Sequence, residues 1–341
     1  MGTTIEDIAK AAGVSSATVS RVLNNPDIVR PDTIAKVTAV IEAYRYKPNI
    51  FARGLMRSRT DSVGIIVPNI SNPYFMAMVE NIESILAKNG THIYLCNSQV
   101  DERAEMSYLH ELIRRNVDAL MLIEPSMFNR ADNYFLAYEA PCPLILVNEH
   151  VSQETRHHIV RCDQAPGLLQ ALEHFAAHGA FPIALVNSAS DSYSFALKDM
   201  LLRRFSKERG LPEESTLSYH LEGDPDHEEI VFAAAKFCGR ILEGPRRPRA
   251  LLAGNELIGV GLLQGALAAG IRVPEELAII GVDNTILSRI GPRQLSTVDL
   301  RPKDVGKAVA DLYLKIRGAG QDGIPPAREK LDSFLILRST T

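Results

Sequence analysis

A short stretch near the N-terminus carries several hydroxyl side chains and one guanidinium, groups that can bind a nucleic acid. It consists of Ser15, Ser16, Ala17, Thr18, Ser20 and Arg21. Hydroxyls can bind phosphate oxygens, and an arginine can pair with the edge of a guanine. Val19, Val22 and Leu23 recur at helical spacing, so we expect an apolar face toward the protein and a polar face outward. A polar helix face on any small bundle has the same pattern, and the pattern alone leaves both interpretations open.

A second group of polar and aromatic side chains follows the predicted strands of the remaining chain. The candidates are Tyr74, Phe75, Asn148, Ser192, Ser194, Lys198, Asn255, Glu256 and Asp283. Ligands bind at the carboxyl ends of parallel strands, and aromatic rings with amides, carboxylates and a cation suit a polyhydroxylated ligand such as a sugar. Each residue alone has a simpler explanation, since Asn255 and Asp283 could cap helices. Their shared position at strand ends favours a ligand site.

Three helical patterns precede residue 60 and would position the hydroxyl-rich stretch. Thr3 and Glu6 have capping-box spacing at the start of the first helix, and Gly13 can end it. Ser15 is a suitable cap for the second helix. Pro31 suits the first turn of a third helix, whose inward-facing residues are predicted to be Ile34, Val37, Ile41 and Tyr44. Two short helices, a glycine turn and a supporting helix predict a helix-turn-helix head.

From Ser62 onward, short apolar runs alternate with helical patterns. The predicted strands are Val63–Val67, His92–Cys96, Ala119–Ile123, Leu144–Val147, Ile183–Val186, Ala250–Ala253 and Ala278–Val282, and the helical patterns include Tyr74–Lys88 and Arg103–Arg114. This alternation predicts an α/β fold with doubly wound parallel sheets covered by helices on both faces. Because this part is too long for one compact sheet, we expect two lobes.

Composition and charge exclude several classes of protein. The chain has 341 residues, 46% hydrophobic and 23% charged, without an apolar run long enough to span a membrane. The first residues lack the apolar core of a secretory signal, and the four cysteines are widely spaced, so we expect a cytoplasmic protein. Residues 1–59 carry nine Lys/Arg and five Asp/Glu, a net charge of +4, which leaves −8 for the rest. A basic head on an acidic body modestly favours a polyanionic partner.

Motifs for catalysis or metal binding are absent from the sequence. It contains no G-x-S-x-G, Walker, G-x-G-x-x-G or H-E-x-x-H motif. His157 and His158 are adjacent, so on a strand they would face opposite sides and could not share a metal ion. We therefore expect no enzyme, no metal site and no cofactor, and we interpret the histidines as surface or capping residues.

The N-terminal motifs resemble those of the lactose-repressor/galactose-repressor family of bacterial transcription regulators. The matching segments are Thr4-Ile5-Glu6-Asp7-Ile8-Ala9-Lys10-Ala11-Ala12-Gly13-Val14-Ser15, Ala17-Thr18-Val19-Ser20-Arg21-Val22-Leu23-Asn24, Tyr46-Lys47-Pro48-Asn49 and Ala52-Arg53-Gly54-Leu55. The resemblance implies that Ser16, Ala17 and Arg21 read base edges. It also implies that Thr4, Ser15, Thr18, Ser20 and Asn24 contact phosphates.

The family's organisation implies a head at 1–47, a hinge helix and linker at 48–60, and an effector-binding and dimerisation core at 61–341. The core would resemble periplasmic sugar-binding proteins, with one lobe at about 61–160 plus 293–318 and the other at about 161–292 plus 319–341. A helix over Asn49–Arg57 is too short to be stable alone, and Gly54 weakens it further. We expect it to fold on DNA, with Asn49, Ala52, Leu55 and Met56 at the minor groove and Leu55 as a wedge.

The resemblance implies a sequence-specific DNA-binding regulator, most simply a repressor, that acts as a homodimer on a near-palindromic operator. A small effector, expected to be a sugar or a sugar derivative, would bind between the lobes. Lys198 stands where the family usually has arginine, Asn148-Glu149 where Asp-Arg is common, and Asn255-Glu256 where Asn-Asp is common. These departures leave the identity of the effector open. The alternatives are an exported-type sugar-binding protein and an architectural DNA-binding protein without effector control.

Overall fold

The computed structural model describes residues 3–24, 26–44, 46, 59–125, 140–148, 157–189, 192–222, 228–320 and 323–341. The chain divides into two compact units, Met1–Thr60 and Asp61–Thr341. Each unit has its own apolar core. None of the helices in the described ranges combines the length and the apolar character needed to cross a bilayer.

Three helices build the first unit. They are α1 (Ile5–Ala12), α2 (Ser16–Asn24) and α3 (Pro31–Ala43), and the short 3-10 turn η1 (Pro26–Ile28) lies between α2 and α3. The buried side chains of this unit are Ile8, Ala9, Ala12, Val19, Val22 and Val37. Gly13 follows α1 with a φ of 64°, a left-handed conformation that glycine adopts without strain, and α2 begins three residues later. The predicted helix-turn-helix arrangement is confirmed.

Two predicted details of the head are wrong. The capping box joins Thr4 and Asp7 instead of Thr3 and Glu6: the Asp7 backbone N–H donates to the Thr4 hydroxyl at 3.3 Å, and the Thr4 backbone N–H donates to the Asp7 carboxylate at 2.8 Å. Both threonines precede an acidic residue by three positions, so the sequence permits either register. Tyr44 does not face inward, because it follows the last residue of α3 and is 52% exposed, and Tyr46 packs against the core instead.

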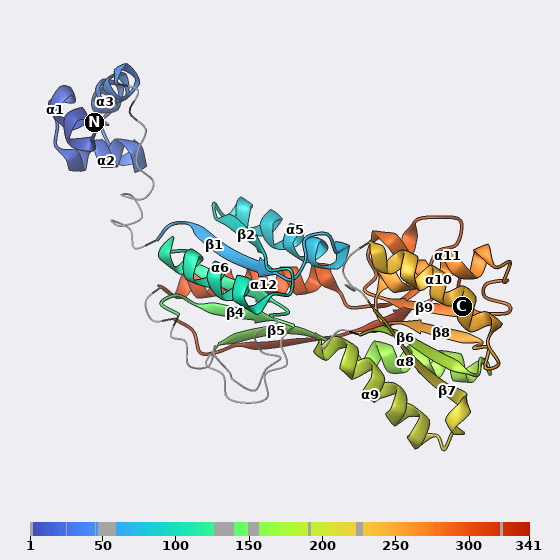
Figure 1. The fold of residues 1–341 in the computed structure, drawn as a ribbon. Coiled ribbons are helices and arrows are strands. Elements are labelled where there is room, and N and C mark those ends of the chain that lie inside the picture. The colour runs from blue at the N-terminus through green and yellow to red at the C-terminus, as the bar shows by residue number, and fades with distance from the viewer. Residues whose placement is uncertain are drawn as a thin grey trace. The chain divides into compact units, whose positions relative to one another are not determined.

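The second unit contains two six-stranded sheets (Figure 1). The first has the order β11-β5-β4-β3-β1-β2, with strands β1 (Ser62–Val67), β2 (His92–Asn97), β3 (Ala119–Ile123), β4 (Leu144–Val147), β5 (His158–Asp163) and β11 (Arg328–Asp332). The second has the order β12-β10-β9-β8-β6-β7, with strands β6 (Ile183–Ser188), β7 (Thr216–Leu221), β8 (Ala250–Ala253), β9 (Ala278–Val282), β10 (Ser296–Asp299) and β12 (Phe334–Ile336). All neighbouring strands are parallel except β12, which is antiparallel to β10.

Helices cover both faces of each sheet, because successive side chains of a strand point to opposite faces and apolar side chains on both faces must be buried. The helices are α5 (Pro73–Lys88), α6 (Glu102–Arg114) and α12 (Pro302–Ala319) on the first sheet, and α8 (Ala165–Ala177), α9 (Tyr193–Glu208), α10 (Glu229–Glu243) and α11 (Glu256–Ala268) on the second. In β1, Val63 and Ile65 pack with α5 and α12, whereas Ile66 packs with α6 on the opposite face. The predicted doubly wound α/β class is confirmed.

Close packing of α10 against α11 depends on two glycines. A Cβ atom added to Gly261 would lie 2.3 Å from the Val231 carbonyl oxygen, and one added to Gly265 would lie 2.3 Å from the Ala235 carbonyl oxygen. No side chain fits at such a distance, so the two helices approach backbone to backbone along this line.

The chain passes between the two sheets three times: from β5 to α8, from β10 to α12, and from β11 to β12. The predicted lobe boundaries are therefore wrong in two places. Residues 293–299 were assigned to the first lobe, but β10 pairs with β9 in the second sheet. Residues 319–332 were assigned to the second lobe, but β11 pairs with β5 in the first sheet. Neither β10 nor β11 has an apolar run that would reveal a strand in the sequence.

Candidate functional site

Helix α2 presents its polar residues away from the core of the head. Val19 and Val22 are buried, whereas Ala17 and Arg21 are exposed. Ser16, Thr18 and Ser20 are half-buried at the edges of this face. The face that remains accessible therefore includes the only guanidinium of α2, which a major groove could receive.

Hydroxyls at the starts of the first two helices already have partners within the head. The Thr4 hydroxyl takes part in the capping box of α1. The Ser15 hydroxyl accepts a hydrogen bond from the Thr18 backbone N–H at 3.2 Å and lies 2.9 Å from the Thr18 hydroxyl. Both Thr4 and Ser15 are exposed, so their oxygens remain accessible from solvent. The side chain of Asn24 and the whole of Asn49, Ala52, Leu55 and Met56 lie outside the described residues.

In the first lobe, Asn148 organises the residues at the strand ends. It directly follows β4 with a φ of 56°, and its Nδ2 donates to the Tyr74 hydroxyl at 2.6 Å and to Glu124 Oε1 at 3.2 Å. Its Oδ1 accepts from the Cys162 backbone N–H at 3.0 Å, which fixes the orientation of the amide. Tyr74 lies in the first turn of α5, which the Asn72 side chain caps. Phe75 is buried in the core next to Tyr74, with the ring centroids 5.3 Å apart.

In the second lobe, Lys198 is buried on α9 among oxygen acceptors. Its Nζ lies 3.1 Å from Gln164 Oε1, 3.1 Å from the Ser194 carbonyl oxygen and 2.8 Å from the Ser194 hydroxyl. Ser192 caps α9, since its hydroxyl accepts from the Phe195 backbone N–H. The Phe195 ring lies 5.1 Å from the Lys198 Nζ. Lys198 is only 2% exposed, so its charge lies almost entirely within the protein.

The remaining predicted residues lie at the ends of β8 and β9. Asn255 caps α11 and accepts from the Ile258 backbone N–H at 2.9 Å. Asp283 follows β9, and its carboxylate accepts from the Glu256 backbone N–H at 3.3 Å. Glu256 is 1% exposed, and its own carboxylate accepts from the backbone N–H and the hydroxyl of Thr285. Glu256 therefore holds, through Thr285, the same loop after β9 that carries Asp283.

Charges from both lobes act on one another across this region. Burial lowers the pKa of Lys198 to about 8, although Asp283, Glu124 and Asp199 each favour its charged form. Burial and the charge of Glu256 raise the pKa of Asp283 well above its usual range, while Lys198 opposes the shift. Burial also raises the pKa of Tyr74, and Glu124 adds to the rise. We call Tyr74, Glu124, Asn148, Gln164, Ser194, Lys198 and Asp283 the interlobe cluster.

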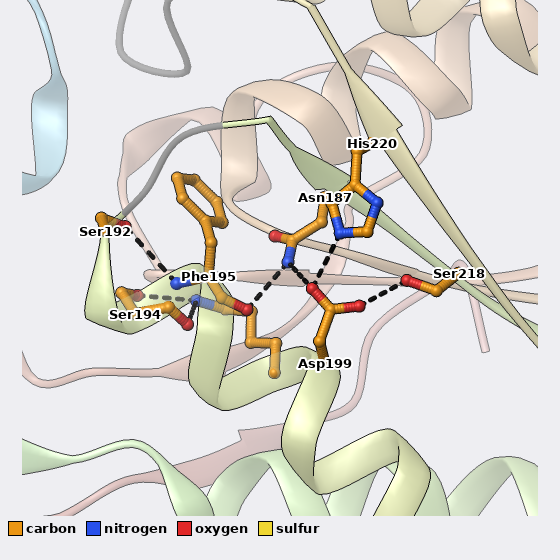
Figure 2. A network of polar contacts seen from close by, with 8 residues as sticks. Asn187, Ser192, Ser194, Phe195, Asp199, Ser218 and His220 are labelled. Carbon is orange, nitrogen blue, oxygen red and sulfur yellow. Dashed lines mark hydrogen bonds and ion pairs between the residues drawn. The ribbon is translucent and has the colours of Figure 1, made fainter.

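A polar network on Asp199 fixes the first turns of α9 (Figure 2). The Asn187 amide donates to the Phe195 carbonyl oxygen and to the Asp199 carboxylate, both at 2.9 Å. Ser218 and His220, which lie on the edge strand β7, also hydrogen-bond to Asp199. Burial raises the pKa of Asp199, but these hydrogen bonds outweigh it and hold the pKa below its usual value. The network therefore joins the helix that carries Ser194 and Lys198 to β6 and β7.

Glu124 and Gln164 belong to the interlobe cluster but were not predicted from the sequence. Glu124 directly follows β3, so the strand-end rule that selected Asn148 would also have selected it. Gln164 directly follows β5, which was not among the predicted strands. His157 and His158 are both buried, so the predicted surface or capping role is wrong for these two residues. No group of three metal-ligating side chains occurs within the described ranges.

A separate cavity of about 220 Å³ lies in the second lobe. It is lined in part by His174, His178, Arg249 and Glu275. It also includes Ala278, the first residue of β9, so it lies at the amino end of that strand. The interlobe cluster lies at the carboxyl ends and shares no lining residue with this cavity.

Comparison with known proteins identifies relatives of both units. Residues 4–49 match the family described as bacterial regulatory proteins, lacI family, and residues 172–341 match the periplasmic binding protein-like domain. Catabolite control protein A of Priestia megaterium is 32% identical over 318 residues, which cover 92% of each chain. A lac repressor dimer bound to operator and the anti-inducer ONPF has a TM-score of 0.82 at 22% identity, covering 100% of this chain and 99% of that one. A LacI family regulator from Enterococcus faecium with bound ribose has a TM-score of 0.69 at 23% identity, covering 82% and 98%.

Proposed function

The chain belongs to the lacI family of bacterial regulatory proteins, and from this premise we propose that it is a repressor whose operator affinity is switched by a small effector. The effector, a sugar or a sugar derivative, binds at the interlobe cluster. The relatives named above are regulators or repressors, and we assign no catalytic activity to this chain.

The exposed face of α2 carries the DNA-binding part of the proposal. Val19 and Val22 belong to the core of the head, while Arg21 and Ala17 are exposed on the other side of the helix. Arg21 can form a bidentate pair with guanine, and Ser16 and Ala17 are small enough to let the helix approach the bases. One head reads few bases, so we propose a homodimer on a near-palindromic operator.

The interlobe cluster supports the effector part of the proposal. It combines an aromatic hydroxyl, an amide, carboxylates and an ammonium from two lobes, which suits a ligand with several hydroxyl groups. The ribose in the Enterococcus faecium relative is consistent with this class of ligand. An effector that contacts both lobes shifts the protein between a DNA-binding and a non-binding conformation only if it binds the two conformations with different affinities. Because either conformation could be the favoured one, an inducer and a co-repressor are both compatible with the cluster.

A selection experiment tests the proposal. Fragments of the source genome are selected on the purified full-length chain, with random duplex of equal length as the competitor, in the presence and absence of a panel of sugars, sugar acids and nucleobases. We expect enrichment of near-palindromic fragments, and at least one compound should change their affinity and stabilise the protein by about 2.7 kcal/mol at 100 times its Kd. Equal retention of genomic and random duplex under all conditions would refute the proposal.

A further inference from the structure

Gln164 links the interlobe cluster to the first crossover between the sheets. It is the single residue between the end of β5 and the start of α8, and it is 4% exposed. Its Oε1 accepts from the Lys198 Nζ at 3.1 Å, and its Nε2 donates to the Ser194 hydroxyl at 3.0 Å. One carboxamide therefore holds two residues of α9 from the crossover segment.

The backbone of Gln164 is joined to a second crossover. Ser333 is the single residue between β11 of the first sheet and β12 of the second. Its hydroxyl donates to the Gln164 carbonyl oxygen at 3.0 Å and accepts from the Gly167 backbone N–H at 3.0 Å. Its backbone N–H donates to the Asp163 carbonyl oxygen. The two crossovers are therefore hydrogen-bonded to each other at the residue whose side chain holds Lys198.

We propose that Gln164 is a positioning residue that holds the Lys198 ammonium and ties its position to both crossover segments. This inference rests on the proposed function only in treating Lys198 as an effector-binding residue. The ammonium has three N–H groups, and three protein oxygens accept from it. An effector oxygen that binds Lys198 must replace one of these acceptors, and replacement of Gln164 Oε1 would release Lys198 from the two segments that connect the sheets.

The pKa of Lys198 depends on the charged groups around it, so a measurement of that pKa can test the role of Gln164. The charged groups that act on it are Asp199 on α9, Asp283 after β9 and Glu124 after β3, and the Phe195 ring lies beside it. Within the described part of the chain, the hydrogen bonds of the ammonium go to Gln164 and Ser194. A change of charge at position 164 would therefore alter the proton affinity of Lys198 directly.

The test follows the stability of the full-length chain between pH 7 and pH 10.5. The unfolding free energy of the wild type should rise with pH once the folded protein loses the Lys198 proton, so the onset of the rise is set by the folded-state pKa of about 8. Gln164→Glu places a carboxylate about 3 Å from the ammonium and should move this onset up by at least one pH unit. Gln164→Leu removes an acceptor and should move it down. Gln264→Glu, on the exposed surface of α11, is the matched control and should leave it unchanged.

Opposite shifts of the onset for the two Gln164 variants distinguish positioning from general damage to the fold, which would lower the unfolding free energy of both variants without separating their onsets. Equal onsets, or shifts of the same sign, would overturn the inference, and Gln164→Leu alone decides the sign if the glutamate variant does not fold. Amide exchange tests the tie to the crossovers: in Gln164→Leu, peptides over 163–169 and 332–336 should both exchange at least threefold faster, with 62–67 as reference. Faster exchange at 163–169 alone would refute the link through Ser333. Neither measurement uses DNA or an effector, so failure of the proposed function cannot be mistaken for failure of this inference.

Discussion

Replacement of Lys198 by methionine should change the stability of the protein little near pH 7 and lower it near pH 10.5. Burial lowers the pKa of Lys198 from 10.5 to about 8. A difference of one pKa unit between the folded and unfolded states corresponds to about 1.36 kcal/mol, so at neutral pH the buried ammonium destabilises the folded state by roughly 3 kcal/mol relative to the neutral amine. Methionine removes this cost but also removes the three hydrogen bonds of the ammonium to Gln164 and Ser194, each worth about 1 kcal/mol. The two effects nearly cancel, so we expect a stability close to that of the wild type at pH 7.

The sign follows from proton binding in the two states. Between pH 8 and pH 10.5, the unfolded chain keeps the Lys198 proton while the folded protein has lost it, so the stability of the wild type rises with pH in this window. The Lys198→Met variant lacks this rise. The variant should therefore become progressively less stable than the wild type above pH 8, with the largest difference near pH 10.5.

Urea unfolding of the full-length chain at pH 7, 8, 9 and 10.5, followed by circular dichroism, measures this difference. Lys207→Met is the matched control, because Lys207 is exposed on the same helix. The control and the wild type should remain parallel at every pH. A constant difference between Lys198→Met and the wild type over the whole range would show that the folded-state pKa of Lys198 is not lowered.

Three further predictions concern the DNA-binding head and the packing of the core. Arg21→Ala should reduce discrimination between selected and random duplex by 1–3 kcal/mol, about 5- to 150-fold, and Ala17→Gly should reduce it less; equal losses in a competition assay would contradict the assignment. If the dimer contacts 6–10 phosphates, affinity measured by fluorescence anisotropy should fall about 10³- to 10⁵-fold between 50 and 200 mM salt, and a flat response would exclude such contacts. Gly261→Ala should destabilise the second lobe by about 1–3 kcal/mol in urea unfolding, because its Cβ would meet the Val231 carbonyl oxygen; Gly239→Ala on α10 meets nothing within 4 Å and should be neutral or stabilising by up to about 1 kcal/mol.

The strands that the sequence predicts most accurately are those in the interior of the two sheets. Predicted and observed bounds agree for Ala119–Ile123, Leu144–Val147, Ala250–Ala253 and Ala278–Val282. An interior parallel strand is buried on both faces, so it appears as an unbroken apolar run. An edge strand such as β11, with the sequence Arg-Glu-Lys-Leu-Asp, is paired on one side only and carries no such run. The lobe boundaries were wrong because β10 and β11, neither of which has an apolar run, lie next to the crossovers between the sheets.

The strand-end rule identified much of the interlobe cluster, because the carboxyl ends of parallel strands meet at one edge. It placed Asn148, Lys198 and Asp283 in one region, and the structure brings their charges and hydrogen bonds within reach of one another. Gln164 was missed for a physical reason: β5 mixes polar with apolar residues, and a strand that is not recognised has no recognised end.

The rule also fails to say which way a side chain turns after the strand, and Glu256 illustrates the consequence. Asn255 uses its side chain to cap α11, so the next residue lies in the first helical turn, and the Glu256 carboxylate points toward Thr285. Burial raises the pKa of Glu256, and its charge raises that of Asp283, so these two carboxyl groups resist simultaneous ionisation. The Lys198 ammonium opposes that shift at Asp283. The protonation of Asp283 therefore depends on its burial and on two residues of other elements, Glu256 and Lys198, which a pattern of residue types along the chain does not reveal.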